Sequence, residues 1–141
     1  MAATNTRRIL LGGAIGGVVW TIWTMVVNVV ILGSRYAVGQ EAGQLLEHPR
    51  YPLFVLYWIV SLFILSFVLA WLYAGVRATR GAGPRTALKL GLAVGFAASV
   101  PANYITATWL PVDRLFPFWW MIDLWVGAIL ASFVAGWVYK D

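Results

Sequence analysis

The sequence predicts an all-α polytopic integral membrane protein, a bundle of four transmembrane helices. Of its 141 residues, 62% are hydrophobic and 11% are charged, and the mean hydropathy is +0.82. A water-soluble domain usually carries about 25% charged residues to cover its surface. Four long runs of this chain are almost free of charge, and a run of roughly 20 apolar residues is enough to cross a bilayer as a helix. We therefore expect a single transmembrane domain that covers residues 1–141.

The four spans are expected at about residues 9–33, 52–76, 87–110 and 116–139. The first follows Arg7 and Arg8, as a cleaved secretory signal would, but its apolar run is longer than that of a signal and no small-residue cleavage site follows it. Between the first two spans, at about residues 37–47, Leu45 and Leu46 stand among glutamines and glutamates. This pattern predicts an amphipathic helix that lies at the outer membrane surface.

Basic residues favour one side of the predicted membrane. The connecting segments place Arg7, Arg8, Arg77, Arg80, Arg85, Lys89 and Lys140 on one side and Arg35, Arg50 and Arg114 on the other. Because segments rich in Lys and Arg stay in the cytoplasm, we expect both termini to be cytoplasmic, in a bacterial inner (cytoplasmic) membrane. The net charge of +5 then favours contact with anionic membrane lipids, and nucleic acid is not expected as a partner.

Two segments near the ends of the second and fourth spans resemble each other. SFVLAWLY at residues 66–73 and SFVAGWVY at residues 132–139 agree at five of eight positions. A duplicated helical hairpin would explain the agreement, and the two copies would then be parallel repeats about an axis along the membrane normal. The alternative is that Trp and Tyr recur because both segments end at the same membrane interface, where these residues are favoured. The sequence leaves both explanations open.

Small and polar residues mark the helix faces that we expect to pack against one another. In the first span, Gly13 and Gly17 share one side of the helix with Thr21, Thr24 and Asn28. Helices in a membrane associate through small residues, which allow the backbones to approach closely. The predicted packing positions are Gly13, Gly17, Gly91, Gly95 and Gly127.

Three polar residues fall at similar expected depths in different spans and define the candidate ligand-binding or polar site. They are Asn28, Asn103 and Asp123, with Arg114 as a charged neighbour at the outer boundary. A carboxylate in the hydrocarbon region is costly unless it is paired or solvated, so Asp123 should face the bundle interior or a cavity. The alternative is that Asp123 reaches the outer headgroups and pairs with Arg114. The first arrangement would make a ligand or proton site, and the second only an interfacial contact.

The residue types present argue against the common metals and cofactors. The chain has no cysteine, which excludes disulfides, thiolate metal sites and cysteine nucleophiles. Its single histidine, His48, falls in the outer connection rather than within a span, where a haem or pigment ligand would be expected. We therefore expect no metal site, and the identity of any cofactor stays unknown at this stage.

Two classes of function fit this pattern. The favoured one is a small non-catalytic subunit or scaffold of a larger membrane assembly, which contacts another membrane protein or a second copy of itself and binds lipid, quinone or pigment between its helices. The alternative is a small oligomeric transporter or channel that uses Asn28, Asn103 and Asp123. One carboxylate within the spans is thin support for coupled transport. An enzyme is not expected, since no nucleophile stands with a base in a recognisable pattern.

Overall fold

The computed structural model describes residues 5–139, and all of its regular structure is helical. Four helical segments are long and apolar enough to cross a membrane. They are α1 (Thr6–Met25) with its continuation as a π-helix, η1 (Val26–Ile31), then α3 (Phe54–Arg80), α4 (Pro84–Trp109) and α5 (Leu115–Val138). A short helix, α2 (Gly33–Glu41), lies between the first two spans. The predicted fold class, a four-helix membrane bundle, is confirmed.

The helices begin and end at residues whose local chemistry explains the boundaries. The α1 helix begins three residues earlier than expected because the side chain of Asn5 accepts a hydrogen bond from the Arg8 backbone N–H and caps it. The α3 helix continues past the apolar run to Arg80, since basic side chains are favourable in the last turn of a helix. It ends at Gly81, whose φ of 82° suits glycine. Lys140, which we assigned to the same side of the membrane, lies outside the described residues.

The helix expected at about residues 37–47 is displaced toward the first span. The observed α2 directly follows η1 and ends at Glu41. The chain turns at Gly43, which has a φ of 70°, and the backbone N–H groups of residues 44 and 45 both donate to the carbonyl of Gly39. Leu45 then packs back against Gly39 and Phe116, so the apolar side chain that suggested a longer helix is covered by a turn instead.

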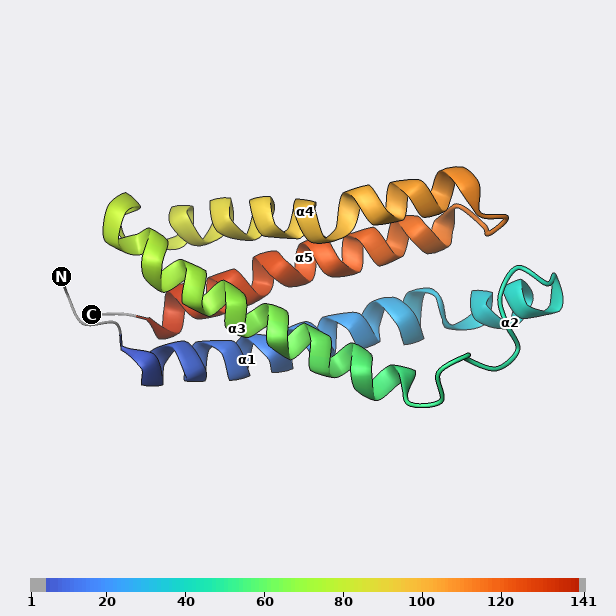
Figure 1. Ribbon diagram of the computed structural model, residues 1–141, viewed down its shortest axis with the longest axis horizontal. Coiled ribbons are helices and arrows are strands. Elements are labelled where there is room, and N and C mark those ends of the chain that lie inside the picture. Colours follow the sequence, from blue (N-terminus) through green and yellow to red (C-terminus); the bar gives the residue numbers. More distant parts are fainter. Residues whose placement is uncertain (1–4, 140–141) are drawn as a thin grey trace.

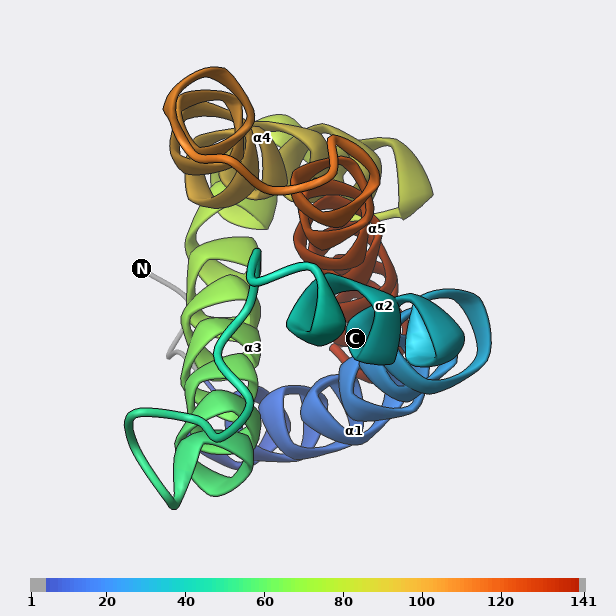
Figure 2. The same ribbon diagram turned by 90° about the vertical axis from the view of Figure 1, so that its right-hand side faces the viewer.

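The helices form two antiparallel hairpins, α1 with α3 and α4 with α5. Viewed along the bundle, α1 and α4 lie at opposite edges, with α3 and α5 between them (Figure 2). The start of α1, the end of α5 and the α3–α4 connection share one end of the bundle, which we call the terminal end, and α2 lies at the other end (Figure 1). The α1 helix contacts α3 and α5, whereas α4 contacts α5 extensively, α3 much less, and α1 not at all within the described residues.

The two hairpins make equivalent contacts at the terminal end. The hydroxyl of Tyr73, at the end of α3, accepts a hydrogen bond from the backbone N–H of Gly83 just before α4, at 2.9 Å. The hydroxyl of Tyr139, at the end of α5, accepts one from the backbone N–H of Asn5 just before α1, at 2.8 Å. These tyrosines are the last residues of the two similar sequence segments. Each hairpin therefore fixes the start of the other, as expected for parallel repeats about an axis along the bundle.

The interface between α1 and α5 has a regular four-residue register. Backbone atoms approach closely where Gly12 faces Ala135 and Gly16 faces Ala131, and a Cβ added to either glycine would lie 3.4 Å from the opposite Cα. One turn further, Gly127 leaves room for the indole ring of Trp20, which a Cβ there would strike. The next turn brings Thr24 opposite Asp123. This register carries the candidate site.

Each of the five glycines predicted to lie at packing positions contacts a neighbouring helix. In α1, Gly13 lies against the ring of Phe67, and a Cβ on Gly17 would come within 2.5 Å of the Phe63 ring. In α4, a Cβ on Gly91 would lie 2.6 Å from the Cα of Ile129, and one on Gly95 would lie 2.6 Å from the ring of Trp125. Gly127 holds Trp20, as described above. Close packing of this kind is how helices associate in lipid.

Candidate functional site

A polar cluster lies inside the bundle around Asp123, at the α1–α5 interface. The Asp123 side chain is 0% exposed. Its Oδ2 atom accepts a short hydrogen bond from the hydroxyl of Thr24 and a second one, at 3.0 Å, from the side-chain amide of Asn28. The three residues come from α5, α1 and η1, so the cluster ties the first and last spans together.

The π-helix η1 presents Asn28 to the cluster. The Asn28 amide also donates to the backbone carbonyl of Thr24, at 2.9 Å, which lies four residues earlier in the chain. In an α-helix, the Thr24 carbonyl would accept from the backbone N–H of Asn28. A π-turn bonds to the fifth residue back instead, so the Asn28 side chain can donate to the Thr24 carbonyl in its place. Local π-turns in spans are frequently found at sites with a specific role.

Three aromatic residues complete the cluster. The Tyr36 hydroxyl, from α2, donates to Oδ1 of Asn28 at 2.7 Å and accepts from the indole N–H of Trp120 at 3.0 Å. The indole N–H of Trp58, from α3, donates to the Thr24 hydroxyl at 3.3 Å. Burial, more than any other cause, raises the pKa of Tyr36 above its ordinary value of 10.0. We call Thr24, Asn28, Tyr36, Trp58, Trp120 and Asp123 the Asp123 cluster.

Apolar packing closes the Asp123 cluster on the side of α2. Val27, Leu32 and Phe116 form a buried group there, and the rings of Tyr36 and Phe116 are 5.3 Å apart. Toward the terminal end, Trp20 occupies the space above Gly127. A polar group enclosed in this way is expensive to leave unpaired, so each hydrogen bond in the cluster contributes to holding one arrangement of the helices.

Some buried polar atoms of the described residues make no hydrogen bond. They are Oδ1 of Asp123, the indole N–H groups of Trp20 and Trp23, and the hydroxyls of Ser66 and Ser132. Ser66 and Ser132 are the first residues of the two similar sequence segments, so this feature is shared by both hairpins. The unpaired Oδ1 leaves Asp123 one acceptor position that neither Thr24 nor Asn28 uses.

Of the four residues predicted for the polar site, the structure brings Asn28 and Asp123 together and leaves Asn103 and Arg114 apart from them. The Asn103 amide donates to the carbonyl of Ser99 in its own helix, at 2.9 Å. No hydrogen bond links Asn103 to the cluster within the described residues, and α4 contacts neither α1 nor η1 there, so the place of Asn103 in the site stays a prediction. Arg114 is exposed at the start of α5. Asp123 is enclosed rather than reaching the headgroups.

The polar site predicted from the sequence did not include Tyr36, Trp58 and Trp120. Aromatic residues near the end of a span fit both the membrane interface and a buried site, because the polar edge of the ring seeks either water or a buried acceptor. Thr24 could have been found, since it stands one turn before Asn28 on the same face of the helix. Among residues 5–139, no three His, Asp or Glu side chains lie close enough together to hold a metal ion.

The cluster offers hydrogen bonds and one carboxyl group in an enclosed setting. The Thr24 hydroxyl donates to Oδ2 of Asp123 and accepts from the indole N–H of Trp58. The arrangement can fix the helices relative to one another, and its free carboxyl oxygen can accept one further donor. Comparison with models of known protein families, with curated protein sequences and with solved structures finds no match to this chain.

Proposed function

We propose that this chain is a small non-catalytic membrane protein that acts as a subunit or scaffold of a larger membrane assembly, with the outer face of α4 against its partner. The observation that carries the proposal is that α4 is both the least apolar span and the least buried one. This helix has the lowest mean hydropathy of the four spans and also the smallest buried share, 17% of its most apolar 18-residue window against 33% in α5. The least apolar span of a bundle would be expected to be the best covered by protein.

The exposed face of α4 has the side chains that helices use to pack in lipid. Ala93, Ala97 and Pro101 are all exposed and lie four residues apart, hence on one side of the helix. We call these three the small-residue face. Tyr104 continues it and is 73% exposed. A helix of another membrane protein can approach such a face closely, and dispersion contacts then take the place of contacts with lipid.

The Asp123 cluster supports a structural role for the remaining spans. Its carboxyl group is held by donors from α1 and η1, and the Tyr36 hydroxyl and the Trp58 indole bond in turn to Asn28 and Thr24. This use of the only carboxylate within the spans favours a fixed bundle. We further propose a bacterial cytoplasmic membrane with both termini cytoplasmic, on the basis of the Lys and Arg distribution.

Site-specific photo-crosslinking in native membranes tests the proposal. A benzophenone amino acid at position 97 should form an adduct of one defined larger mass with a membrane protein, because Ala97 lies in the centre of the small-residue face. The same group in place of Val68, which is exposed on α3, should give no such adduct. An Ala97→Trp variant should lose the partner while the isolated chain keeps its thermal stability.

Other results would contradict the subunit role. An adduct of twice the mass of the chain would mean that copies of this protein pair through α4. Equal adducts from positions 68 and 97 would mean that the α4 face has no special partner. The zero cysteine count allows a second test with single-cysteine variants at the same positions, without a background from native thiols.

A small transporter or channel is the second candidate function, and one observation favours it. Oδ1 of Asp123 is buried without a hydrogen bond, so a proton or a cation could be received there. In proteoliposomes, a pH-dependent flux that Asp123→Asn abolishes would support transport. A wild-type bundle that carries no flux, together with a loss of stability in the same variant, would support the structural role.

A further inference from the structure

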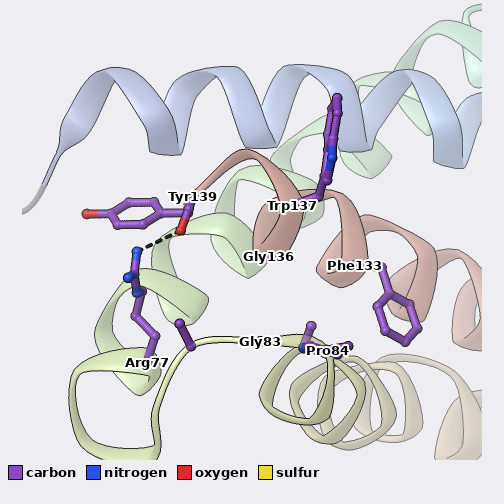
Figure 3. Close-up of a pocket in the computed structure, with 9 residues that line it drawn as sticks. Arg77, Gly83, Pro84, Phe133, Gly136, Trp137 and Tyr139 are labelled. Carbon is purple, nitrogen blue, oxygen red and sulfur yellow. Dashed lines mark hydrogen bonds between the residues drawn. The ribbon is translucent and has the colours of Figure 1, made fainter. Parts of the chain in front are cut away.

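A pocket of about 470 Å³ lies at the terminal end of the bundle, away from the Asp123 cluster and the small-residue face. It is formed by the end of α3, the α3–α4 connection, the start of α4 and the end of α5 (Figure 3). Its volume is within the range of pockets that hold small ligands, roughly 300 to 1,000 Å³. The subunit proposal makes no use of it.

The walls of the pocket differ between its two ends. Arg77 and Tyr139 lie together at one end, while Phe133 and Pro84 lie toward the other (Figure 3). The Arg77 guanidinium donates to the backbone carbonyl of Tyr139 at 2.7 Å and stacks 4.7 Å from the centre of the Tyr139 ring, so it is held in place. The remaining wall includes Trp137, which is 63% exposed. The pocket therefore has one basic and one apolar end.

The chain segment that includes the α3–α4 connection, part of which lines the pocket, is strongly basic. The segment from residue 77 to residue 89 contains Arg77, Arg80, Arg85 and Lys89 and no acidic residue. The last three side chains are exposed around the α3–α4 connection. Trp137 and Tyr139 are aromatic residues of the type that lies at headgroup depth in membranes. A ligand at this depth meets positive charge on the aqueous side and apolar side chains on the membrane side.

We propose that this terminal pocket binds one anionic phospholipid, with its phosphodiester at the Arg77 end and the upper part of an acyl chain along Phe133. Basic pockets between spans are suited to anionic headgroups, because the charges are complementary and little water must be displaced from the apolar wall. The acyl chain of the lipid is required as well as its phosphate, because the pocket wall opposite Arg77 presents apolar atoms.

Native mass spectrometry of the full chain in detergent, with added lipid, measures this binding directly. The wild-type protein should bind one dioleoyl phosphatidylglycerol at least about fivefold more tightly than dioleoyl phosphatidylcholine, since each basic residue near the headgroup adds to the attraction. Ala82→Glu places a carboxylate at a pocket-lining position and should remove this preference. Ala78→Glu makes the same change of net charge at an exposed position that does not line the pocket, and it should keep the preference.

A second pair of variants tests the apolar end. Phe133→Ala should weaken binding of dioleoyl phosphatidylglycerol about threefold or more while leaving the thermal midpoint close to that of wild type, because Phe133 is 37% exposed. Phe118→Ala, at the other end of α5 and 47% exposed, should leave binding unchanged. This pair keeps the proposal testable if a carboxylate at position 82 prevents folding.

Three outcomes would overturn the proposal. Equal affinity of the wild-type protein for the two lipids would remove the charge-selective site. An equal loss of the lipid preference in the Ala82→Glu and Ala78→Glu variants would mean that the net charge of the protein alone causes the preference. Displacement of the lipid by inorganic phosphate or glycerol 3-phosphate at the same concentration would show that the site takes a free phosphate and needs no acyl chain.

Discussion

Breaking the hydrogen bond between Thr24 and Asp123 should destabilise the bundle by an amount that a double-mutant cycle can measure. The Thr24 hydroxyl and the Asn28 amide both donate to Oδ2 of Asp123. Thr24→Val removes the hydroxyl at nearly constant volume and also takes away the acceptor of the Trp58 indole N–H, 3.3 Å away. Asp123→Asn keeps the shape of the side chain but replaces one acceptor oxygen by a donor.

The expected magnitude follows from the burial of the cluster. Hydrogen bonds between helices in a membrane are worth about 0.6 kcal/mol on average and up to about 1.7 kcal/mol, because the unfolded chain in the membrane also finds partners. Asp123 is fully enclosed, so we expect a coupling energy at the upper end, about 1 to 2 kcal/mol, between the two substitutions. Asp123→Leu should cost more, about 2 to 4 kcal/mol, because Thr24 and Asn28 then both lose an acceptor.

The assay is the free energy of unfolding in mixed micelles, from reversible titration with sodium dodecyl sulfate. Wild type, both single variants and the double variant complete the cycle. Thr21→Val is the matched control, since the Thr21 hydroxyl donates to the carbonyl of Gly17 in its own helix, at 2.8 Å, and no coupling with Asp123→Asn is expected. A coupling energy below about 0.3 kcal/mol would refute the reasoning, as would an Asp123→Leu variant as stable as wild type.

Three further predictions test the packing, the pH dependence and the topology. Gly91→Ala should lower the free energy of unfolding by about 1 to 3 kcal/mol, because its Cβ would lie 2.6 Å from the backbone of α5. Gly75→Ala is the control: a Cβ there would have nothing within 4 Å, so this variant should be neutral or stabilising in the same titration. Burial raises the pKa of Tyr36 above 10.0 in the folded state, so the folded protein favours the neutral phenol. The stability that this preference contributes is complete below pH 10 and is lost as the pH rises through the raised pKa. Unfolding measured at successive pH values should show a steeper loss for wild type than for Tyr36→Phe, and parallel curves would contradict the burial of the hydroxyl. Reporter fusions after Arg80 should be cytoplasmic and one within residues 39–43 external, and the reverse result would overturn the charge argument.

The spans could be predicted because their cause is local. A run without charge and long enough to cross a bilayer is visible in the sequence itself, and all four runs are helical in the structure. The displaced α2 shows the limit of this reasoning. Its pattern of leucines among polar residues fits a helix, but the position of Gly43 and the contact of Leu45 with Phe116 decide where the helix ends. That contact depends on how α5 packs.

The sequence predicted how deep in the membrane the residues of the candidate site lie, but not which helices lie next to one another. Counting residues from the span ends placed Asn28, Asn103 and Asp123 at similar heights, and two of the three do meet. Which helices are neighbours depends on packing between them, and no pattern along a single helix states that α4 lies away from α1. The π-turn at η1 was also hidden, because its six residues, VVNVVI, fit an ordinary membrane helix.

The difference between the two hairpins accounts for the exposure of α4. The similar segments at residues 66–73 and 132–139 pair Asp123 of α5 with Tyr57 of α3. On the α1–α5 side, Asp123 collects donors from α1 and η1, and those bonds draw the two helices together beyond the glycine contacts. On the α3–α4 side, Tyr57 is 61% exposed, and Asn103 of α4 bonds within its own helix. Without a carboxyl group to receive its amide, α4 is held mainly by α5 and keeps a free side with small residues. The difference at this one position thus agrees with a first span that is held by Asp123 and a third span with an exposed side, and we base the proposed docking face on that exposed side of α4.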